Sequence, residues 1–254
     1  MNALKPRRLL ILGGTSGIGE ALIRSLVATH PVKLGVHYHS NEKCKEQLEI
    51  SIANSNSEAF FLRTELFFQE ECHRLIDSYV EWADGIDAMI QLTGGVAAVR
   101  SWRDVIEKEW VQDLALNLNA PYFLAQRAME HMSKAKGGKI ILTSTASAQH
   151  GGGADTIAYG VAKAGIEFLT KSLARIGAPH SILVNAVAPG FIETKFHTET
   201  LDRGHKQIKE RIEKIPLKRS GSANEVAAVI KFLLSGECSF ITGEVISVSG
   251  GDWL

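Results

Sequence analysis

Tyr159 and Lys163 are residues whose types and spacing suit proton transfer. They are four positions apart, so on a helix their side chains share one face and can act together. A phenol with a pKa of about 10 exchanges protons poorly at pH 7, but a nearby ammonium favours the phenolate and lowers that pKa. The pair therefore predicts acid–base chemistry, although the same spacing also arises by chance.

A glycine-rich segment near the N-terminus offers a second kind of chemistry. Residues 13–19 read GGTSGIG and lie between an aliphatic run at residues 8–12 and an amphipathic stretch. Glycine lets the backbone turn sharply and approach a pyrophosphate, and a helix that follows presents unpaired N–H groups. The residues expected to contact a dinucleotide here are Gly13, Thr15, Ser16, Gly17, Ile18 and Gly19.

The elements that must position these residues alternate along the chain. Short aliphatic runs at residues 8–12, 32–36, 59–62, 88–92, 140–143, 183–187 and 245–248 predict strands, and residues 20–28, 42–53 and 70–83 predict helices. This alternation is typical of βαβ units. We expect an α/β fold: a single-domain, Rossmann-like, doubly wound parallel seven-stranded sheet with helices on both faces, spanning residues 1–254.

The least regular part of the sequence is residues 194–216, which are rich in charge and histidine. Ligands of open α/β sheets bind beyond the carboxyl ends of the strands, where such segments fall. We expect a substrate lid here, with a solvated pair of helices as the alternative.

Composition excludes several partners. Lys and Arg total 28, as do Asp and Glu, so no net field favours nucleic acid or an anionic membrane. No segment approaches the roughly 20 apolar residues of a membrane helix. The three cysteines and nine histidines show no spacing of a disulfide framework or a metal site. We expect a cytoplasmic protein without a metal, whose partners are small molecules or copies of itself.

The order of the motifs resembles the short-chain dehydrogenase/reductase family. The GxxxGxG spacing of the loop, the YxxxK pair and the segment NAVAPGFIET at residues 185–194 follow one another as in that family, and the match extends to SGG at residues 249–251. The resemblance implies that Tyr159 and Lys163 are catalytic. It also implies that the nicotinamide is bound by Tyr159, Lys163, Pro189, Gly190, Ile192 and Thr194.

Two further catalytic positions follow from the resemblance. Asn117 matches the family asparagine that steadies a water in a proton relay, and its alternative role is that of an asparagine at a helix kink. A hydroxyl that binds the substrate carbonyl is expected at the end of the fifth strand. Position in the motif favours Thr145, residue type favours Ser144, and Ser147 is a weaker third candidate, so this assignment stays open.

The cofactor is expected to be NADP(H), with NAD(H) as the alternative. A carboxylate after the second strand would accept the ribose hydroxyls and repel a 2′-phosphate. None is present among Tyr38, His39, Ser40 and Asn41. By resemblance, Glu65 and its neighbour Leu66 lie near the adenine, and Thr93 and Gly94 follow the fourth strand beside the cofactor.

The sequence departs from the family pattern at Leu12, which replaces a threonine, and at residues 91–94, which read QLTG instead of NNAG. The resemblance is greatest to 3-oxoacyl-acyl-carrier-protein reductases, which implies a ketone reductase for 3-oxoacyl thioesters. A sugar, steroid or xenobiotic dehydrogenase is the alternative, and a non-catalytic redox sensor is the alternative of another class. The family also implies a homo-oligomer, a tetramer or dimer, with residues 245–248, Trp253 and Leu254 at a subunit contact.

Overall fold

The computed structural model describes residues 7–135, 137–194, 196 and 204–252. Its centre is a parallel sheet in the order β3-β2-β1-β4-β5-β6-β7. The strands are β1 (Arg8–Leu12), β2 (Lys33–Tyr38), β3 (Glu58–Arg63), β4 (Ala88–Gln91), β5 (Gly138–Thr143), β6 (Ile182–Pro189) and β7 (Val245–Val248). The chain winds outward in one direction from β1 and in the other from β4. This confirms the expected seven-stranded doubly wound sheet.

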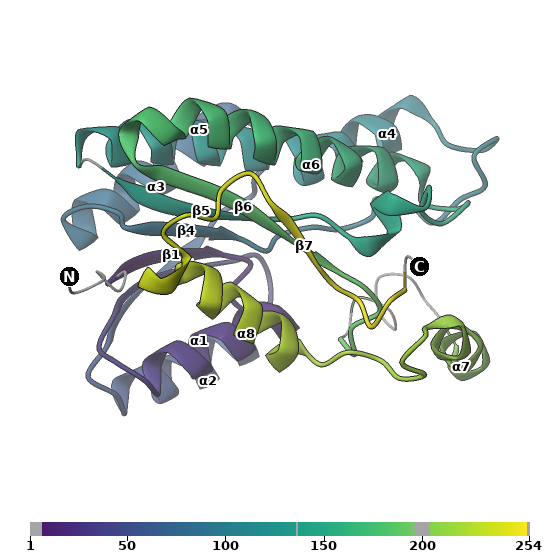
Figure 1. Cartoon of the computed structure of the whole chain (residues 1–254), viewed down its shortest axis with the longest axis horizontal. Coiled ribbons are helices and arrows are strands. Elements are labelled where there is room, and N and C mark those ends of the chain that lie inside the picture. The colour runs from purple at the N-terminus through teal and green to yellow at the C-terminus, as the bar shows by residue number, and fades with distance from the viewer. Residues whose placement is uncertain (1–6, 136, 195, 197–203, 253–254) are drawn as a thin grey trace.

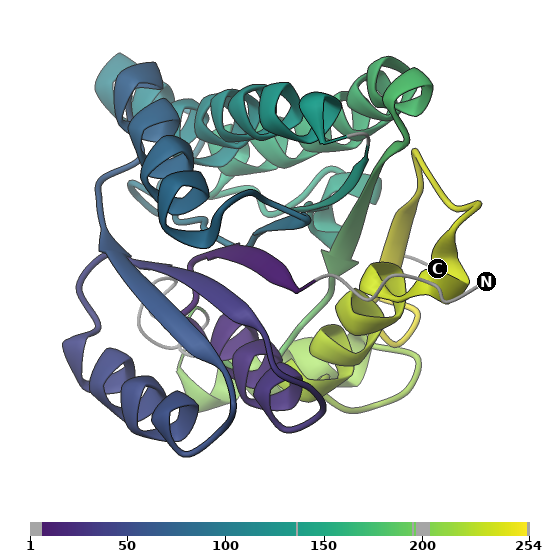
Figure 2. The ribbon, with the colours of Figure 1, turned by 90° about the vertical axis from the view of Figure 1, so that its left-hand side faces the viewer.

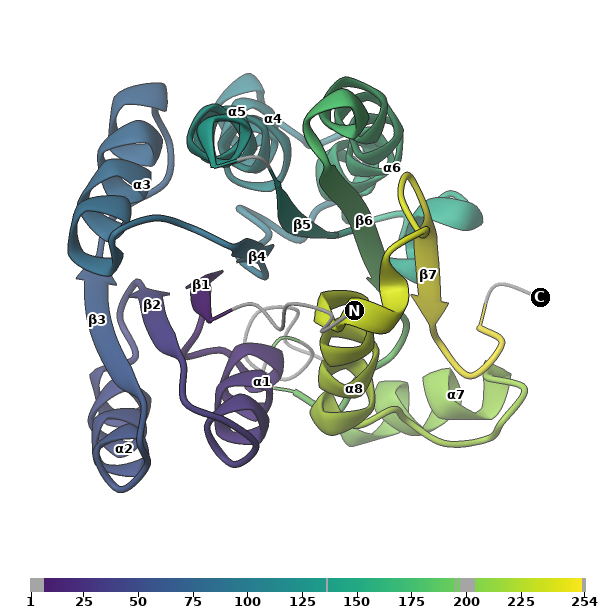
Figure 3. The same cartoon turned by 60° about the vertical axis from the view of Figure 1, so that its left-hand side comes forward.

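Helices cover both faces of the sheet (Figure 1). One layer holds α1, α2 and α8, and the other holds α3, α4, α5 and α6, as the rotated view makes plain (Figure 3). Figure 2 shows the sheet between the two layers from the side. The helices are α1 (Gly17–Val27), α2 (Glu42–Ala53), α3 (Gln69–Ala83), α4 (Glu107–Leu114), α5 (Ala120–Lys134), α6 (Ile157–Gly177), α7 (His205–Lys214) and α8 (Ala223–Leu234).

The alternation of side chains along β1 explains the two layers. Leu10 and Leu12 lie in the core shared with α3, α5 and α6, whereas Leu9 and Ile11 lie in the core shared with α1, α2 and α8. A strand that is buried on both faces reads as a continuous aliphatic run, as RLLIL does. The sheet is therefore held from both sides at its centre, beside the glycine loop.

Several element ends differ from the sequence expectation. The second strand was expected to end at residue 36, but β2 continues because His37 pairs with Leu62 and Tyr38 with Arg63 of β3. The first helix begins at Gly17 rather than at residue 20, because the Ser16 side chain accepts a hydrogen bond from Gly19 N and caps the helix. These shifts place Tyr38 inside the sheet and Gly17, Ile18 and Gly19 in the first turn of a capped helix.

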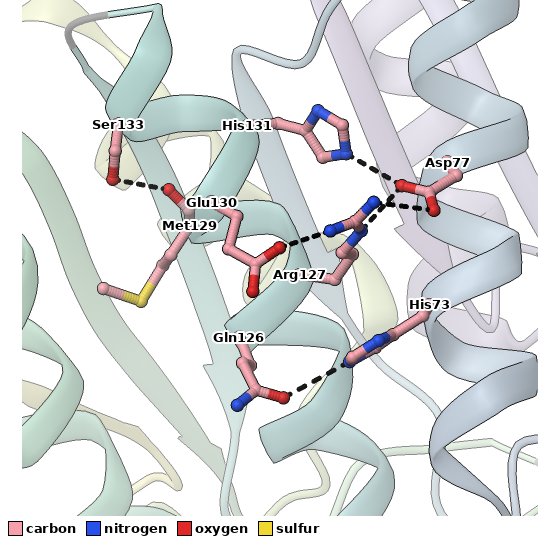
Figure 4. A network of polar contacts seen from close by, with 8 residues as sticks. All are labelled: His73, Asp77, Gln126, Arg127, Met129, Glu130, His131 and Ser133. Atoms are coloured by element: carbon pink, nitrogen blue, oxygen red, sulfur yellow. Dashed lines mark hydrogen bonds and ion pairs between the residues drawn. The ribbon is translucent and has the colours of Figure 1, made fainter.

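Polar contacts join α3 to α5 at the surface of one helical layer (Figure 4). The Asp77 carboxylate accepts from Arg127 Nε at 2.8 Å and Nη2 at 3.0 Å, and it lies 2.8 Å from His131 Nε2. His73 lies 3.3 Å from Gln126 one turn away. These contacts hold α3 and α5 against each other.

In the part of the chain that the structure describes, every helix is too short or too polar to cross a membrane.

Candidate active site

A cavity of about 840 Å³ lies where the carboxyl ends of the central strands meet. Its walls come from the glycine loop after β1, from the segments after β4, β5 and β6, from the first turns of α6, and from α7. Ligands of doubly wound sheets bind at this edge, at the point where the winding direction reverses. The predicted loop and the predicted Tyr–Lys pair therefore line one cavity.

Lys163 is held in place from the floor of this cavity. Its side chain is almost completely buried, with 2% exposure, and Nζ donates to Thr143 O at 2.9 Å. Nζ lies 5.7 Å from the centre of the Tyr159 ring, as expected for residues one helical turn apart. Burial lowers the pKa of Lys163 to about 8, so the ammonium form still predominates at pH 7.

The Tyr159 phenol differs from the sequence expectation in its pKa. Burial raises the pKa of Tyr159 to about 12, a hydrogen bond with the Thr145 side chain opposes this rise, and the charge of Asp113 adds to it. The expected lowering toward neutral pH is wrong for the protein without ligand, because desolvation of the phenolate outweighs the favourable contacts. At pH 7 the phenol is therefore protonated.

The two hydroxyl candidates at the end of β5 point in different directions. Ser144 Oγ lies 3.1 Å from Lys163 O and 3.0 Å from Glu167 Oε1, so its single hydrogen is directed to α6. Ser144 and Thr145 both line the cavity, but Thr145 hydrogen-bonds the Tyr159 side chain. Ser147 also lines the cavity, and its backbone N–H donates to Thr145 Oγ1 at 3.3 Å. Thr145 is the hydroxyl that the fold brings to the phenol.

Asn117 occupies the helix kink that was considered as its alternative role. It is fully buried in a π-helical turn, Ala115–Asn119, where its amide donates to Asp113 O at 2.9 Å and to Gly95 O at 2.8 Å. A π turn frees a backbone carbonyl that the side chain then satisfies. A Cβ on Gly94 would lie 3.0 Å from Asn117 Oδ1 and 3.3 Å from Lys163 Nζ. The kink thus places the asparagine beside the lysine, with only glycine between them.

The glycine loop is shaped to admit an extended ligand. Gly13 has φ +78°, and a Cβ there would lie 3.0 Å from Thr93 N. A Cβ on Gly19 would lie 2.3 Å from Gly13 O, and one on Gly17 would lie 2.8 Å from the Thr194 side chain. A side chain at Gly17 would enter the cavity, and side chains at Gly13 and Gly19 would collide with the neighbouring backbone, so the residues present fit a dinucleotide pyrophosphate at the start of α1.

His37, which the sequence reasoning missed, holds this loop. Its imidazole is 3% exposed; Nδ1 accepts from Gly13 N at 3.3 Å, and Nε2 lies 2.8 Å from Thr64 O. Its carbonyl accepts from Gly14 N at 2.8 Å. Burial lowers the pKa of His37 to about 4, which keeps the ring neutral and Nδ1 able to accept. His37 thus anchors the start of the glycine loop through Gly13. Leu12, which stands where the family has a threonine, has no hydroxyl that could do so.

The residues expected around the adenosine are not gathered into the cavity as one group. Tyr38 is buried and packs edge-on against Phe61, and Leu66 lies in the core. His39 is exposed, with Nε2 3.7 Å from Glu65 Oε1. Ser40 is exposed beside Asn41.

Asn41 does reach the cavity, but its side chain is engaged by the protein. It accepts from Cys44 N at 3.2 Å as the cap of α2, and it donates to Thr15 O at 3.1 Å.

The expected nicotinamide segment lies on the cavity wall with Thr15, Ser16, Ile18 and Thr93. The residues from this segment are Pro189, Gly190, Ile192 and Thr194. Gly190 allows close packing, since a Cβ there would lie 2.7 Å from Ser249 Cα. Part of the expected lid, residues 195 and 197–203, lies outside the described residues, as do Trp253 and Leu254.

Other cavity residues were not predicted individually, although Phe196 and Arg211 fall within the expected lid. Phe196 lies with its ring centre 5.9 Å from that of Tyr159. Arg211 forms an ion pair with Asp252, 41 residues away, and both line the cavity. Such a pairing depends on how α7 meets the C-terminal segment, which no local pattern encodes. Among the described residues, no group of three or more potential metal ligands is found.

Comparison with known proteins places the chain in a family. A family model described as enoyl-(acyl carrier protein) reductase matches residues 13–252. A 3-oxoacyl-acyl-carrier-protein reductase of Aquifex aeolicus is 35% identical over 244 residues, covering 95% of each chain. Glucose 1-dehydrogenase 2 of Bacillus subtilis is 29% identical, covering 98% of this chain and 95% of that protein.

A solved structure agrees with this assignment. A short-chain type dehydrogenase/reductase from Mycobacterium ulcerans has a TM-score of 0.89 at 26% identity, over 97% of this chain and 90% of that one. The doubly wound sheet with its glycine loop defines the class of dinucleotide-binding α/β oxidoreductases. Within that class, the chain belongs to the short-chain dehydrogenase/reductase family, which acts on carbonyl and alcohol groups.

Proposed function

We propose that the protein is a nicotinamide-dependent ketone reductase whose substrates are of the 3-oxoacyl-thioester type. The proposal rests on three side chains that meet at one cavity. They are the Tyr159 phenol, the Thr145 hydroxyl that is hydrogen-bonded to it, and the buried Lys163 ammonium. The similarity to 3-oxoacyl-acyl-carrier-protein reductase supports the thioester class.

The glycine loop and the segment after β6 would hold the dinucleotide, and the nicotinamide, when bound, supplies the hydride. In the reduction, Thr145 Oγ1 donates a hydrogen bond to the substrate carbonyl oxygen and orients it. Tyr159 then gives its proton to that oxygen, because a protonated phenol is the form present at neutral pH. The protein thus contributes placement and a proton.

Lys163 stabilises the phenolate that this transfer leaves. Its ammonium is fixed by the hydrogen bond to Thr143 O and is almost fully buried, so the charge acts through little water. Gly94 lies between the Asn117 side chain and Lys163 Nζ. Asn117 is therefore placed to connect the lysine to a proton source through water. We propose Asn117 as the start of that relay.

Turnover with a panel of carbonyl compounds tests the function. NADPH and NADH oxidation is followed with an acetoacetyl thioester, a keto sugar, a steroid ketone and an aromatic ketone. We expect the thioester to be reduced fastest and Tyr159→Phe to lower kcat by about 100-fold or more, since that is typical of a lost acid catalyst. Tyr122→Phe, an exposed tyrosine on α5, is the matched control and should keep full activity.

The same experiment separates the alternatives. Preference for the sugar or the steroid would replace the thioester assignment while leaving the reaction class intact. If the wild type binds the cofactor but reduces nothing faster than Tyr159→Phe does, the protein is a sensor and not an enzyme.

We propose NADP(H) as the preferred cofactor. Residues 38–41 carry no carboxylate, and the exposed His39, Ser40 and Lys43 can meet a 2′-phosphate. Ligand at about 100 times its Kd stabilises a protein by about 2.7 kcal/mol, so the melting temperature reports binding directly. We expect NADPH to raise the Tm more than NADH does at equal concentration. A larger shift with NADH would reverse the assignment.

A further inference from the structure

The α7 side of the cavity carries charged side chains that the proposed reaction does not use. Arg211 and Lys214 are three residues apart on α7, so they share a helix face, and both line the cavity. Asp252 joins them from the segment after β7, which runs beside α7 (Figure 3). Most of the other lining residues are glycines or have hydroxyl-bearing or apolar side chains.

Arg211 is fixed rather than mobile. Its Nη2 pairs with Asp252 Oδ2, and the side chain of Asp252 is only 3% exposed while that of Arg211 is 24% exposed. A carboxylate this deeply buried is retained only with a charged partner. The backbone bond from Leu217 N to Gly250 O, 3.2 Å long, ties the same two segments together. The guanidinium is therefore held at the cavity surface in one orientation.

The charges on the cavity wall do not balance. Among the described residues that line it, Lys163, Arg211 and Lys214 are cationic and Asp252 is the one carboxylate. A guanidinium has five N–H donors, and the contact with Asp252 uses only part of them. Lys214 is exposed on the same helix face. An anion entering this part of the cavity would meet two cations and one carboxylate that is already paired.

We propose that Arg211 and Lys214 form a subsite for an acidic group of the substrate, a carboxylate or a phosphate, at the α7 end of the cavity. The carbonyl group of the same molecule would lie at Tyr159, beside Phe196. This inference rests on the proposed reductase function and narrows its substrate class. Asp252 acts through Arg211 as a positioning residue. The pyrophosphate of the cofactor offers the same chemistry, and the experiment distinguishes the two sources.

The test uses keto acids of increasing chain length, each paired with its methyl ester. We expect the wild type to prefer the acid of matching length by about tenfold or more in kcat/KM, because a charge-assisted hydrogen bond contributes that much. Arg211→Gln and Lys214→Gln should each raise KM for the acid by about tenfold and leave KM for the ester and for NADPH unchanged. Lys209→Gln, an exposed lysine on α7 outside the cavity, should match the wild type.

Three kinetic results would overturn the subsite. No preference for the acid over its ester would remove the premise. An increase in KM for NADPH with both substrates would assign the cations to the pyrophosphate. An equal increase for acid and ester would make them structural. Because Lys214 is exposed, its variant should fold even if Arg211→Gln leaves Asp252 unpaired and unfolds.

Calorimetry separates this inference from the reductase function. Reduction of the esters without any preference for the acids contradicts the subsite and leaves the function standing. If neither is reduced, turnover of the acetoacetyl thioester decides the function, and calorimetric titration of wild type and Lys214→Gln with the keto acids still decides the subsite. Binding that is weaker in the variant supports it, and equal binding contradicts it.

Discussion

At the scale of single residues, the neighbouring Ser144 and Thr145 have different roles: the first hydroxyl bonds to α6, and the second lies beside the proposed proton donor. Both follow β5, but the Ser144 hydroxyl is taken up by Lys163 O and Glu167, whereas Thr145 lies at the phenol. One residue of register along an extended segment directs the side chain to the opposite side. The two roles can therefore be measured separately.

We expect Thr145→Val to lower kcat by about 100-fold, because a hydrogen-bond donor aimed at a developing oxyanion typically contributes that much. Thr145→Ser should keep most of the activity. Ser144→Ala should stay within a few fold of the wild type while losing about 1 kcal/mol of stability for its hydrogen bond. Steady-state kinetics and urea unfolding provide the measurements. The reverse pattern, with Ser144→Ala inactive, would contradict the assignment of Thr145.

His37 predicts a dependence of stability on pH. Its pKa is about 4 in the folded protein, below the usual value, so folding keeps the ring neutral. The unfolded chain takes up a proton near its ordinary pKa of about 6.5, and the folded chain does not. Stability from this residue is therefore complete above pH 6.5 and is lost as the pH falls toward 4.

Chemical unfolding at pH 7 and pH 4.5 measures the effect of His37. We expect the wild type to lose about 2 to 3 kcal/mol more than His37→Asn does over this interval, since each pH unit contributes about 1.4 kcal/mol. Asparagine keeps an acceptor for Gly13 N without titrating. His39→Asn, exposed two residues away, is the control and should behave as the wild type. Equal losses in wild type and His37→Asn would show that the imidazole is not held neutral by folding.

At the scale of elements, the sheet is built from strands buried on both faces, and helices must be locked onto it by contacts of their own. The Asp77 cluster is such a contact between α3 and α5 (Figure 4). The guanidinium of Arg127 lowers the pKa of Asp77 through its hydrogen bonds. The carboxylate thus stabilises the fold above its unfolded pKa, and this contribution is lost in acid.

We expect Asp77→Asn to lower the free energy of unfolding by about 1 kcal/mol at pH 7, a modest value because the groups are partly exposed. The difference from wild type should disappear as the pH falls below the folded pKa of Asp77. Glu81→Gln, an exposed acid on the same helix, is the control and should be neutral. A difference that persists in acid would indicate loss of packing rather than of charge.

At the scale of the whole molecule, one exposed apolar stripe suggests how copies of the chain associate. Ile157, Val161, Phe168 and Ile176 recur along one side of α6 and are 41 to 76% exposed. Large apolar surfaces that face water are typical of protein interfaces. The proposed homo-oligomer would cover this stripe.

We expect the wild type to be a dimer or tetramer by light scattering and Phe168→Glu to be smaller, because a buried unpaired charge opposes association. Lys171→Glu, which also places a glutamate on an exposed position of α6, is the control and should keep the oligomer. A wild type that is a monomer, or a Phe168→Glu variant of unchanged size, would contradict the proposal.

Much of this architecture could be predicted before the structure was known. The aliphatic runs, the glycines at 13, 17 and 19, and the spacing of Tyr159 and Lys163 are local patterns. They depend on backbone geometry and on periodic burial, which act over a few residues. The strands, the doubly wound order and the location of the loop and of the Tyr–Lys pair followed from them. The ends of β2 and α1 did not, because pairing with β3 and capping by Ser16 decided them.

The sequence by itself determined the elements and the chemistry that they bring to one edge of the sheet. Only the tertiary structure decided which hydroxyl faces Tyr159, that burial raises the pKa of that phenol, and that His37 holds the loop. It also decided the pairing of Arg211 with Asp252 at the cavity. Each of these depends on contacts between side chains from distant segments and on the exclusion of water by packing. Neither effect produces a periodic pattern in the sequence, so neither could be predicted from it.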